Sequence, residues 1–353
     1  MNPSRKSCSR SLAALAVTAA IVLAAALPAP LFPQAPAFRV PGSRAELEQA
    51  LTSQAAAVRG RVGILVKHVE SGESFGLRED ERFQLASVFK IPVLLTLYKQ
   101  IGLGRISLDD RIMFKERMKT FGSGLMASMK PGLNISVQDL QLLMMARSDN
   151  TATDILFRLV TPQAIAAYMA DLGLVATTVD YDTRQLILAY LGLDPGKPLT
   201  PAELAALPES VWADKSRLAA EKAFETSIHN TSTPREIALL LEKCVRGEIV
   251  DRATSDRILT TMRSHTGAEL ILRYLPATVD VARKGGSLAR NGEDTVLLDA
   301  AVIWLPDKAG TLVMCFFANG LQEVHYEIKH KIGLMARAAY DYFFAKNGKP
   351  KRP

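Results

Sequence analysis

A serine and a lysine stand three residues apart in the stretch FQLASVFKIPVLLTLYKQ (residues 83–100), which is otherwise almost wholly apolar. If a helix begins at or just after Ser87, residues three apart share a face, and the Lys90 amine lies beside the Ser87 hydroxyl. The unsatisfied N–H groups at that helix start can stabilise an oxyanion. Because burial makes an amine lose its proton more easily, Lys90 can act as the base for a nucleophilic Ser87. The structural alternative is a helix-capping serine followed by a snorkelling lysine.

Two further segments contain polar or charged residues that could take part in catalysis or ligand binding. RSDNTATD (residues 147–154) stands between two apolar helical patterns, and Thr151 followed by Asp154 is a capping signal typical of a polar turn. RKGGSLARNGE (residues 283–293) has Lys284 at the end of a strand-like run, before two glycines that permit close approach of a ligand or another backbone. Its structural alternative is an edge-strand lysine entering a loop. Each segment alone has a structural explanation.

The elements that must position these residues follow from apolar periodicity. Residues 43–57 predict a capped helix, and residues 61–80 predict a hairpin around the turn ESGES. From residue 87 to about 246 the pattern is mostly helical, and strand patterns return near the end before a last helix. We therefore expect an α+β fold in which an antiparallel sheet is built from both chain ends and a helical lobe is inserted.

This order of elements predicts how the chain is divided into lobes. Residues 38–86 and 251–345 form an α/β lobe, residues 87–250 form a helical lobe with an insertion near 194–226, and residues 346–353 form a basic tail.

The first 37 residues differ from the rest of the chain. Arg5, Lys6 and Arg10 precede an apolar run over residues 12–27, and small residues follow that offer a cleavage site. We expect a secretory signal and a periplasmic or secreted protein, with an uncleaved membrane anchor as the alternative. Removal of this segment lowers the net charge from +7 to +4. Because the remaining charge forms no basic block, we expect no nucleic-acid partner.

The sequence offers no pattern for a metal or cofactor, and we expect neither. Cys244 and Cys315 form no CxxC motif. They could pair with each other in an oxidising compartment, but two free buried thiols are the default interpretation. The histidines are scattered without a ligand motif, at positions 68, 229, 265, 325 and 330.

In their order along the chain, Ser-x-x-Lys, Ser-Asp-Asn and Lys-Gly-Gly are similar to the three motifs of the penicillin-recognising serine hydrolases. The surrounding stretches resemble class A β-lactamases from about residue 47 to 344. The resemblance implies a β-lactamase/transpeptidase-like fold. It also implies that Ser87 is the acylated nucleophile and Lys90 its neighbouring base, although the base for acylation in class A enzymes is disputed.

The same resemblance assigns roles to the other motif residues. Ser148 relays a proton toward the leaving nitrogen and links the two lysines, and Asn150 holds the amide of the substrate. Lys284 supplies positive potential for the substrate carboxylate and keeps Lys90 neutral by like-charge repulsion. The backbone N–H groups of Ser87 and Ser287 form the oxyanion hole, and Gly286 is a further substrate-binding position.

The chain departs from the family where a Glu-x-x-Leu-Asn loop is expected, whose glutamate activates the water that releases the acyl group. Residues 172–192 have no such pattern, and the best register puts Gln185 at the glutamate position. An amide can position water but cannot take its proton. The insertion offers Trp212 as an apolar contact for the cleft. It also holds four glutamates that we expect on solvated helix faces but that can in principle replace the base: Glu203, Glu209, Glu221 and Glu225.

A second departure is Gly285, which stands where the family has a threonine or serine hydroxyl near the substrate carboxylate. Arg283, Ser287 and Arg290 are the candidates to compensate, with Arg290 preferred for its charge. Phe121 is expected at the rim of the cleft or, as the alternative, packed inside its loop.

Three functions remain open at this point. The first is an exported serine hydrolase acylated by β-lactams or related amides, with intact acylation and slow deacylation. The second is a D-alanyl-D-alanine carboxypeptidase or transpeptidase acting on peptidoglycan-derived peptides. The third is a non-catalytic binder of a β-lactam or cell-wall ligand.

Overall fold

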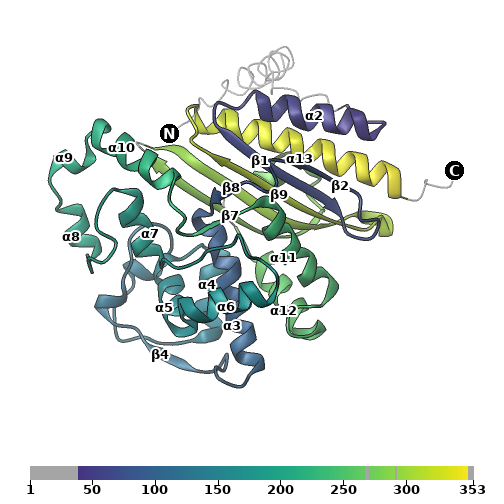
Figure 1. The fold of residues 1–353 in the computed structure, drawn as a ribbon. Coiled ribbons are helices and arrows are strands. Elements are labelled where there is room, and N and C mark those ends of the chain that lie inside the picture. Colours follow the sequence, from purple (N-terminus) through teal and green to yellow (C-terminus); the bar gives the residue numbers. More distant parts are fainter. Residues whose placement is uncertain (1–38, 267–269, 291, 349–353) are drawn as a thin grey trace, which may run out of the picture. The chain divides into compact units, whose positions relative to one another are not determined.

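Strands from both ends of the chain form one antiparallel sheet in the order β2-β1-β9-β8-β7 (Figure 1). The computed structural model describes residues 39–266, 270–290 and 292–348, so the predicted secretory signal lies outside the described residues. The sheet confirms the predicted α+β class. Its strands are β1 (Arg61–His68), β2 (Ser74–Leu77), β7 (Asp280–Arg290), β8 (Glu293–Trp304) and β9 (Thr311–Asn319).

The predicted first helix and hairpin are both confirmed. Helix α2 (Arg44–Ala56) is capped by Ser43, whose hydroxyl accepts a hydrogen bond from the Glu46 N–H at 3.2 Å. Strands β1 and β2 pair with Val66 opposite Phe75, and Gly72 takes the positive φ of +73° that their turn requires.

The two faces of the sheet carry separate apolar cores. Strand β9 shows the division, because Met314 and Phe316 face one core while Cys315 and Phe317 face the other. Helix α2 and the last helix, α13 (His325–Asn347), cover the first face together (Figure 1). Helices α11 (Pro234–Arg246) and α12 (Arg252–Arg263) lie on the opposite face. The sheet therefore forms the middle layer of the described part of the chain.

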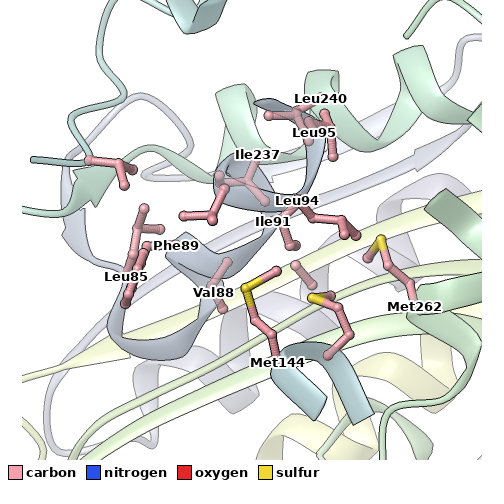
Figure 2. Packing of buried hydrophobic residues seen from close by; sticks show 14 of the residues in the cluster. Leu85, Val88, Phe89, Ile91, Leu94, Leu95, Met144, Ile237, Leu240 and Met262 are labelled. Atoms are coloured by element: carbon pink, nitrogen blue, oxygen red, sulfur yellow. The ribbon is translucent and has the colours of Figure 1, made fainter. Parts of the chain in front are cut away.

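The helical region joins the second face through one apolar cluster around α3 (Lys90–Gly102) (Figure 2). Leu94 and Leu95 of α3 meet Leu240 of α11, and Met144 and Met262 approach from α4 and α12. The other helices of this region are α4 (Val137–Ala146), α5 (Asn150–Val160), α6 (Pro162–Asp171), α7 (Thr183–Tyr190), α8 (Pro201–Ala205), α9 (Glu209–Trp212) and α10 (Asp214–Glu225). Two-stranded ladders join β3 (Phe83–Gln84) with β6 (Thr231–Ser232) and β4 (Arg111–Met113) with β5 (Asn134–Ser136).

Some details differ from the sequence-based expectations. Helix α3 begins at Lys90, so Pro92 falls in the first turn, where its missing N–H costs no helical hydrogen bond. Helix α13 extends to Asn347, and Lys346 pairs with Glu73 at 2.6 Å, so the predicted basic tail begins later than residue 346. No helix among the described residues is long and apolar enough to cross a membrane. Cys244 and Cys315 are buried free thiols, as predicted.

Candidate active site

The predicted nucleophile lies where the sheet edge meets the start of α3. Ser87 belongs to a short 3-10 helix, η2 (Ala86–Phe89), which continues directly into α3, and Ala86 before it holds a positive φ of +41°. A non-glycine residue in that region is uncommon and is often found at functional sites. Strand β7 approaches η2 so closely that a Cβ on Gly286 would lie 2.7 Å from the Ser87 nitrogen. Glycine at 286 is therefore a requirement of packing.

Lys90 is completely buried, and its amine faces the Ser-Asp-Asn segment. The Lys90 Nζ lies 2.7 Å from the Ser148 carbonyl, 3.0 Å from the Ser148 Oγ and 2.8 Å from the Asn150 Oδ1. Among the described residues it forms no hydrogen bond to Ser87, although we expected the amine beside that hydroxyl. The 3-10 helix over residues 86–89 still places residues three apart on one face, but the hydrogen bonds of the Lys90 amine go to Ser148 and Asn150 instead.

Ser148 connects the two lysines. Its Oγ lies 3.0 Å from the Lys90 Nζ and 3.0 Å from the Lys284 Nζ, and its backbone holds a positive φ of +51°. Lys284 also donates to the Gly285 carbonyl at 2.6 Å. Asn150 donates its amide to the Phe121 carbonyl at 2.9 Å, which fixes the side chain that accepts from Lys90. The structure thus brings together the residues from all three motifs.

Burial makes both amines easier to deprotonate. It lowers the pKa of Lys90 to about 7, against the opposing attraction of Asp154 and Asp149. For Lys284, burial lowers the pKa well below its usual value, and repulsion from Lys90 lowers it further. We expected repulsion from Lys284 to keep Lys90 neutral, but desolvation is the main cause for both side chains. An amine with a pKa near neutrality is suited to proton transfer.

A cavity of about 500 Å³ opens over these residues. Ser87, Ser148 and Asn150 line one side, with Gly286 and Ser287 of β7. We call these residues, with the buried amines of Lys90 and Lys284 behind them, the polar wall. Leu186, Ile187 and Tyr190 of helix α7 also line the cavity, and we call these residues the α7 wall.

No aspartate or glutamate lines this cavity within the part of the chain that the structure describes. A Cβ on Gly122 would lie 3.3 Å from the Ile187 Cδ1 and 2.5 Å from the Asn150 Nδ2, which shows that the Ile187 side chain reaches toward the polar wall. Ile187 was not singled out in the sequence. The apolar spacing of residues 186, 187 and 190 carries a signal for one helix face, but it does not tell which face meets the cavity.

The structure does not bring every predicted site residue to the cavity. The Gln185 amide oxygen accepts from the Asp182 N–H at 3.0 Å in a capping box, so it closes the start of α7. Phe121 is buried and contributes its carbonyl to Asn150, while its ring does not line the cavity. Arg290 lies outside the lining and pairs with Glu221 at 3.1 Å. The structure therefore does not support the cavity roles of Gln185 and Arg290 or the rim position of Phe121, whereas the burial of Phe121 agrees with the alternative that it packs inside its loop.

His265 is a cavity residue that sequence reasoning missed. Its Nδ1 lies 2.8 Å from the Met145 carbonyl, and its Nε2 accepts from the Gly285 N–H at 3.3 Å. Burial, with the charges of Lys284 and Arg283, lowers the pKa of His265 to about 3, so the ring is neutral. Because the Nε2 accepts a hydrogen bond, the proton is on the Nδ1, and this N–H donates to the Met145 carbonyl. One signal in the sequence could have indicated this histidine: glycine replaces the family's threonine or serine at position 285. The imidazole of His265 lies against the side of Gly285 that has no side chain.

The insertion supports the α7 wall from behind. The Tyr190 hydroxyl lies 2.7 Å from the Thr295 Oγ1 and 3.2 Å from Glu221, and the Arg217 guanidinium stands 4.8 Å from the centre of its ring. Glu221 is buried, whereas we expected it on a solvated face; Glu203, Glu209 and Glu225 are exposed as expected. Trp212 is partly exposed and does not line the cavity.

Comparison with known proteins agrees with this geometry. The profile of the β-lactamase enzyme family matches residues 46–343. β-Lactamase L2 of Stenotrophomonas maltophilia is 30% identical over 250 residues, which cover 70% of each chain. The crystal structure of a β-lactamase from Sphaerobacter thermophilus superposes with a TM-score of 0.66 at 26% identity, covering 85% of this chain and 97% of that one.

A penicillin-binding protein, PBP-A, shares the fold as well. A point mutant of PBP-A, solved as an acyl-enzyme complex with penicillin G, has a TM-score of 0.64 at 21% identity and covers 88% of this chain and 99% of its own. The family profile spans the three motifs and both lobes of the fold. The chain therefore belongs to the β-lactamase enzyme family, as a serine hydrolase of the class A β-lactamase type.

Proposed function

We propose that β-lactams or related amides acylate Ser87 and that release of the acyl group is slow. The Ser87 Oγ attacks the carbonyl carbon, and the C–N bond breaks. The Oγ proton passes to the neutral Lys90 amine and through the Ser148 hydroxyl to the leaving nitrogen. The hydrogen bonds of 3.0 Å from Ser148 to both lysines support this path.

Slow release rests on one observation, the lack of a carboxylate among the described residues that line the cavity. Hydrolysis of an acyl-enzyme needs a group that takes a proton from water on the side facing the ester. Here α7 contributes Leu186 and Ile187 to the lining, and apolar side chains neither hold nor deprotonate water. The polar wall thus has groups suited to acylation, while the described part of the α7 wall offers no carboxylate to act as the base for deacylation.

The test is a time course with a chromogenic cephalosporin, followed by absorbance and by intact mass. We expect a burst close to one equivalent, a mass increase on Ser87 and then a slow phase. Ser87→Ala is the control and should show neither burst nor adduct. Rapid steady turnover without a burst contradicts slow deacylation, and no adduct on the wild-type protein contradicts the acyl-enzyme.

A D-alanyl-D-alanine carboxypeptidase is the second candidate. The missing carboxylate favours it over an efficient β-lactamase, because poor release of a β-lactam adduct is compatible with a peptidase that evolved for other acyl groups. The fold shared with PBP-A, a mutant of which was captured with penicillin G, agrees with this alternative. Release of D-alanine from a pentapeptide stem would establish it, and no release would remove it.

Export is the remaining part of the proposal. Three basic residues and an apolar run at the N-terminus support a periplasmic or secreted location. Cell fractionation combined with the mass of the mature N-terminus tests it, since a signal that is cleaved leaves a shorter chain outside the cytoplasm.

A further inference from the structure

The usual candidates for binding an anionic substrate group are all engaged. Arg290 pairs with Glu221 at 3.1 Å, outside the cavity lining. Arg283 is buried and pairs with Asp299 at 3.0 Å. Both guanidinium groups therefore have their charge balanced by a carboxylate of this chain.

The side chains of His265 and Lys284, which also lie near Gly285, are poorly suited to bind an anion. His265 is neutral and uses its N–H on the Met145 carbonyl. The Lys284 amine is buried and bonded to the Ser148 hydroxyl and the Gly285 carbonyl. Its pKa is lowered by burial, so its positive charge is not assured at neutral pH.

Arg147 is the charged residue among the described residues that line the cavity. It directly precedes Ser148, ends helix α4 and is exposed. One of its nitrogens, Nη1, donates to the Thr266 hydroxyl at 3.2 Å, and among the described residues no carboxylate pairs with it. A second cavity of about 300 Å³ adjoins the first at Arg147, Ser148 and His265. The guanidinium therefore stands at the junction of two hollows with donors to spare.

We propose that Arg147 forms the anion subsite of this enzyme and takes the carboxylate on the leaving-group side of the substrate. In the proposed reaction Ser148 delivers the proton to the leaving nitrogen, and Arg147 lines the same two hollows as Ser148, so the guanidinium is placed to bind a carboxylate attached near that nitrogen. A guanidinium keeps its charge at all relevant pH values and can bind a carboxylate through two parallel hydrogen bonds. This inference rests on the proposed acylation of Ser87.

The experiment compares a penicillin with the methyl ester of the same penicillin, which lacks the negative charge. The second-order rate of Ser87 acylation is measured by intact mass for both compounds. Arg147→Ala should slow acylation by the acid about tenfold to a hundredfold, since a hydrogen bond to a charged group is lost, and should leave the ester almost unchanged. Arg147→Lys should restore part of the preference for the acid, because it keeps the charge but not the two-pronged geometry.

Arg105→Ala is the matched control, because Arg105 is exposed and bonds only to Gln100 at 3.2 Å in the described structure. It should preserve the acid-to-ester ratio. Acylation by the ester also reports that the Arg147 variants are folded. An unchanged acid rate, or an equal loss for acid and ester, overturns the Arg147 subsite. Failure of both compounds to acylate the wild-type protein contradicts the proposed function instead.

Discussion

The polar wall and the α7 wall line one cavity, but their side chains differ in chemistry. In the polar wall Ser148 and Asn150 hold buried amines through hydrogen bonds of 2.7–3.0 Å. The α7 wall presents Leu186, Ile187 and one face of Tyr190, whose hydroxyl is turned to Thr295 and Glu221. Groups suited to forming an acyl-enzyme therefore lie in the polar wall, while the α7 wall offers mainly apolar contacts.

The largest effect should come from removing the base in the polar wall. Lys90→Met keeps most of the buried volume but deletes the amine, and general-base catalysis contributes about a hundredfold to ten-thousandfold. We expect acylation of Ser87 to fall by that factor in a mass-based time course. Lys99→Met, in the last turn of the same helix, is the control and should acylate normally. Loss of less than about threefold in Lys90→Met would mean that another group is the base.

The pH dependence of acylation sharpens the same assignment. The reactive form of Lys90 is the neutral amine, and burial lowers its pKa to about 7, so the neutral fraction grows as the pH rises. The rate should increase about fiftyfold from pH 5 to pH 7, and by about a further factor of two above pH 7, where it levels off. Stopped-flow measurement of the burst from pH 5 to 9 checks this. A flat profile across that interval contradicts an amine base.

The close approach of β7 to the nucleophile can be tested at two neighbouring glycines. In Gly286→Ala the new Cβ would lie 2.7 Å from the Ser87 nitrogen, so backbone must move. Overpacking of this kind costs about 1–3 kcal/mol of folding stability. Acylation should also slow, by up to about a hundredfold, because the Ser87 N–H expected in the oxyanion hole is displaced.

Gly285→Ala is the matched control, because its Cβ would meet its neighbours at 3.5 Å or more and its φ is not positive. Thermal melting should stay close to wild type for this variant, and acylation should be nearly unchanged. Equal effects of the two substitutions would show that position 286 has no special contact with Ser87.

The proposal that the α7 wall lacks a base for deacylation can be tested by adding a carboxylate to it. Ile187→Glu places a carboxylate on the side chain that reaches toward Asn150 and Gly122, where a raised pKa in apolar surroundings suits a general base. We expect deacylation to speed up by about tenfold, seen as a faster slow phase after the burst. Ile187→Gln has the same shape without the basicity, and it should leave the slow phase as it is. Equal acceleration by both variants would point to water entry rather than base catalysis.

The fold and the polar wall could be predicted from the sequence more completely than the α7 wall. Alternation in residues 61–80 and capping by Ser43 are local signals, and both elements formed as predicted. The three motifs are short and keep their spacing, which is why Ser87, Lys90, Ser148 and Lys284 were found. Gln185 was placed by register alone, and the structure uses it as a cap because Asp182 stands three residues before it. The placement of Arg147 and His265 at the cavity depends on contacts between segments distant in the sequence, such as Arg147 with Thr266 and His265 with Met145, and apolar periodicity does not predict such contacts.

The shared hydroxyl of Ser148 has a consequence for how charge moves during a reaction. With an amine 3.0 Å away on either side, one proton can change places between Lys90 and Lys284 without leaving the protein. Because repulsion from Lys90 lowers the pKa of Lys284, a proton on one amine disfavours a second proton on the other. A proton collected from the attacking oxygen can be stored and returned while the interior keeps the same net charge, so no solvent ion has to enter to balance it.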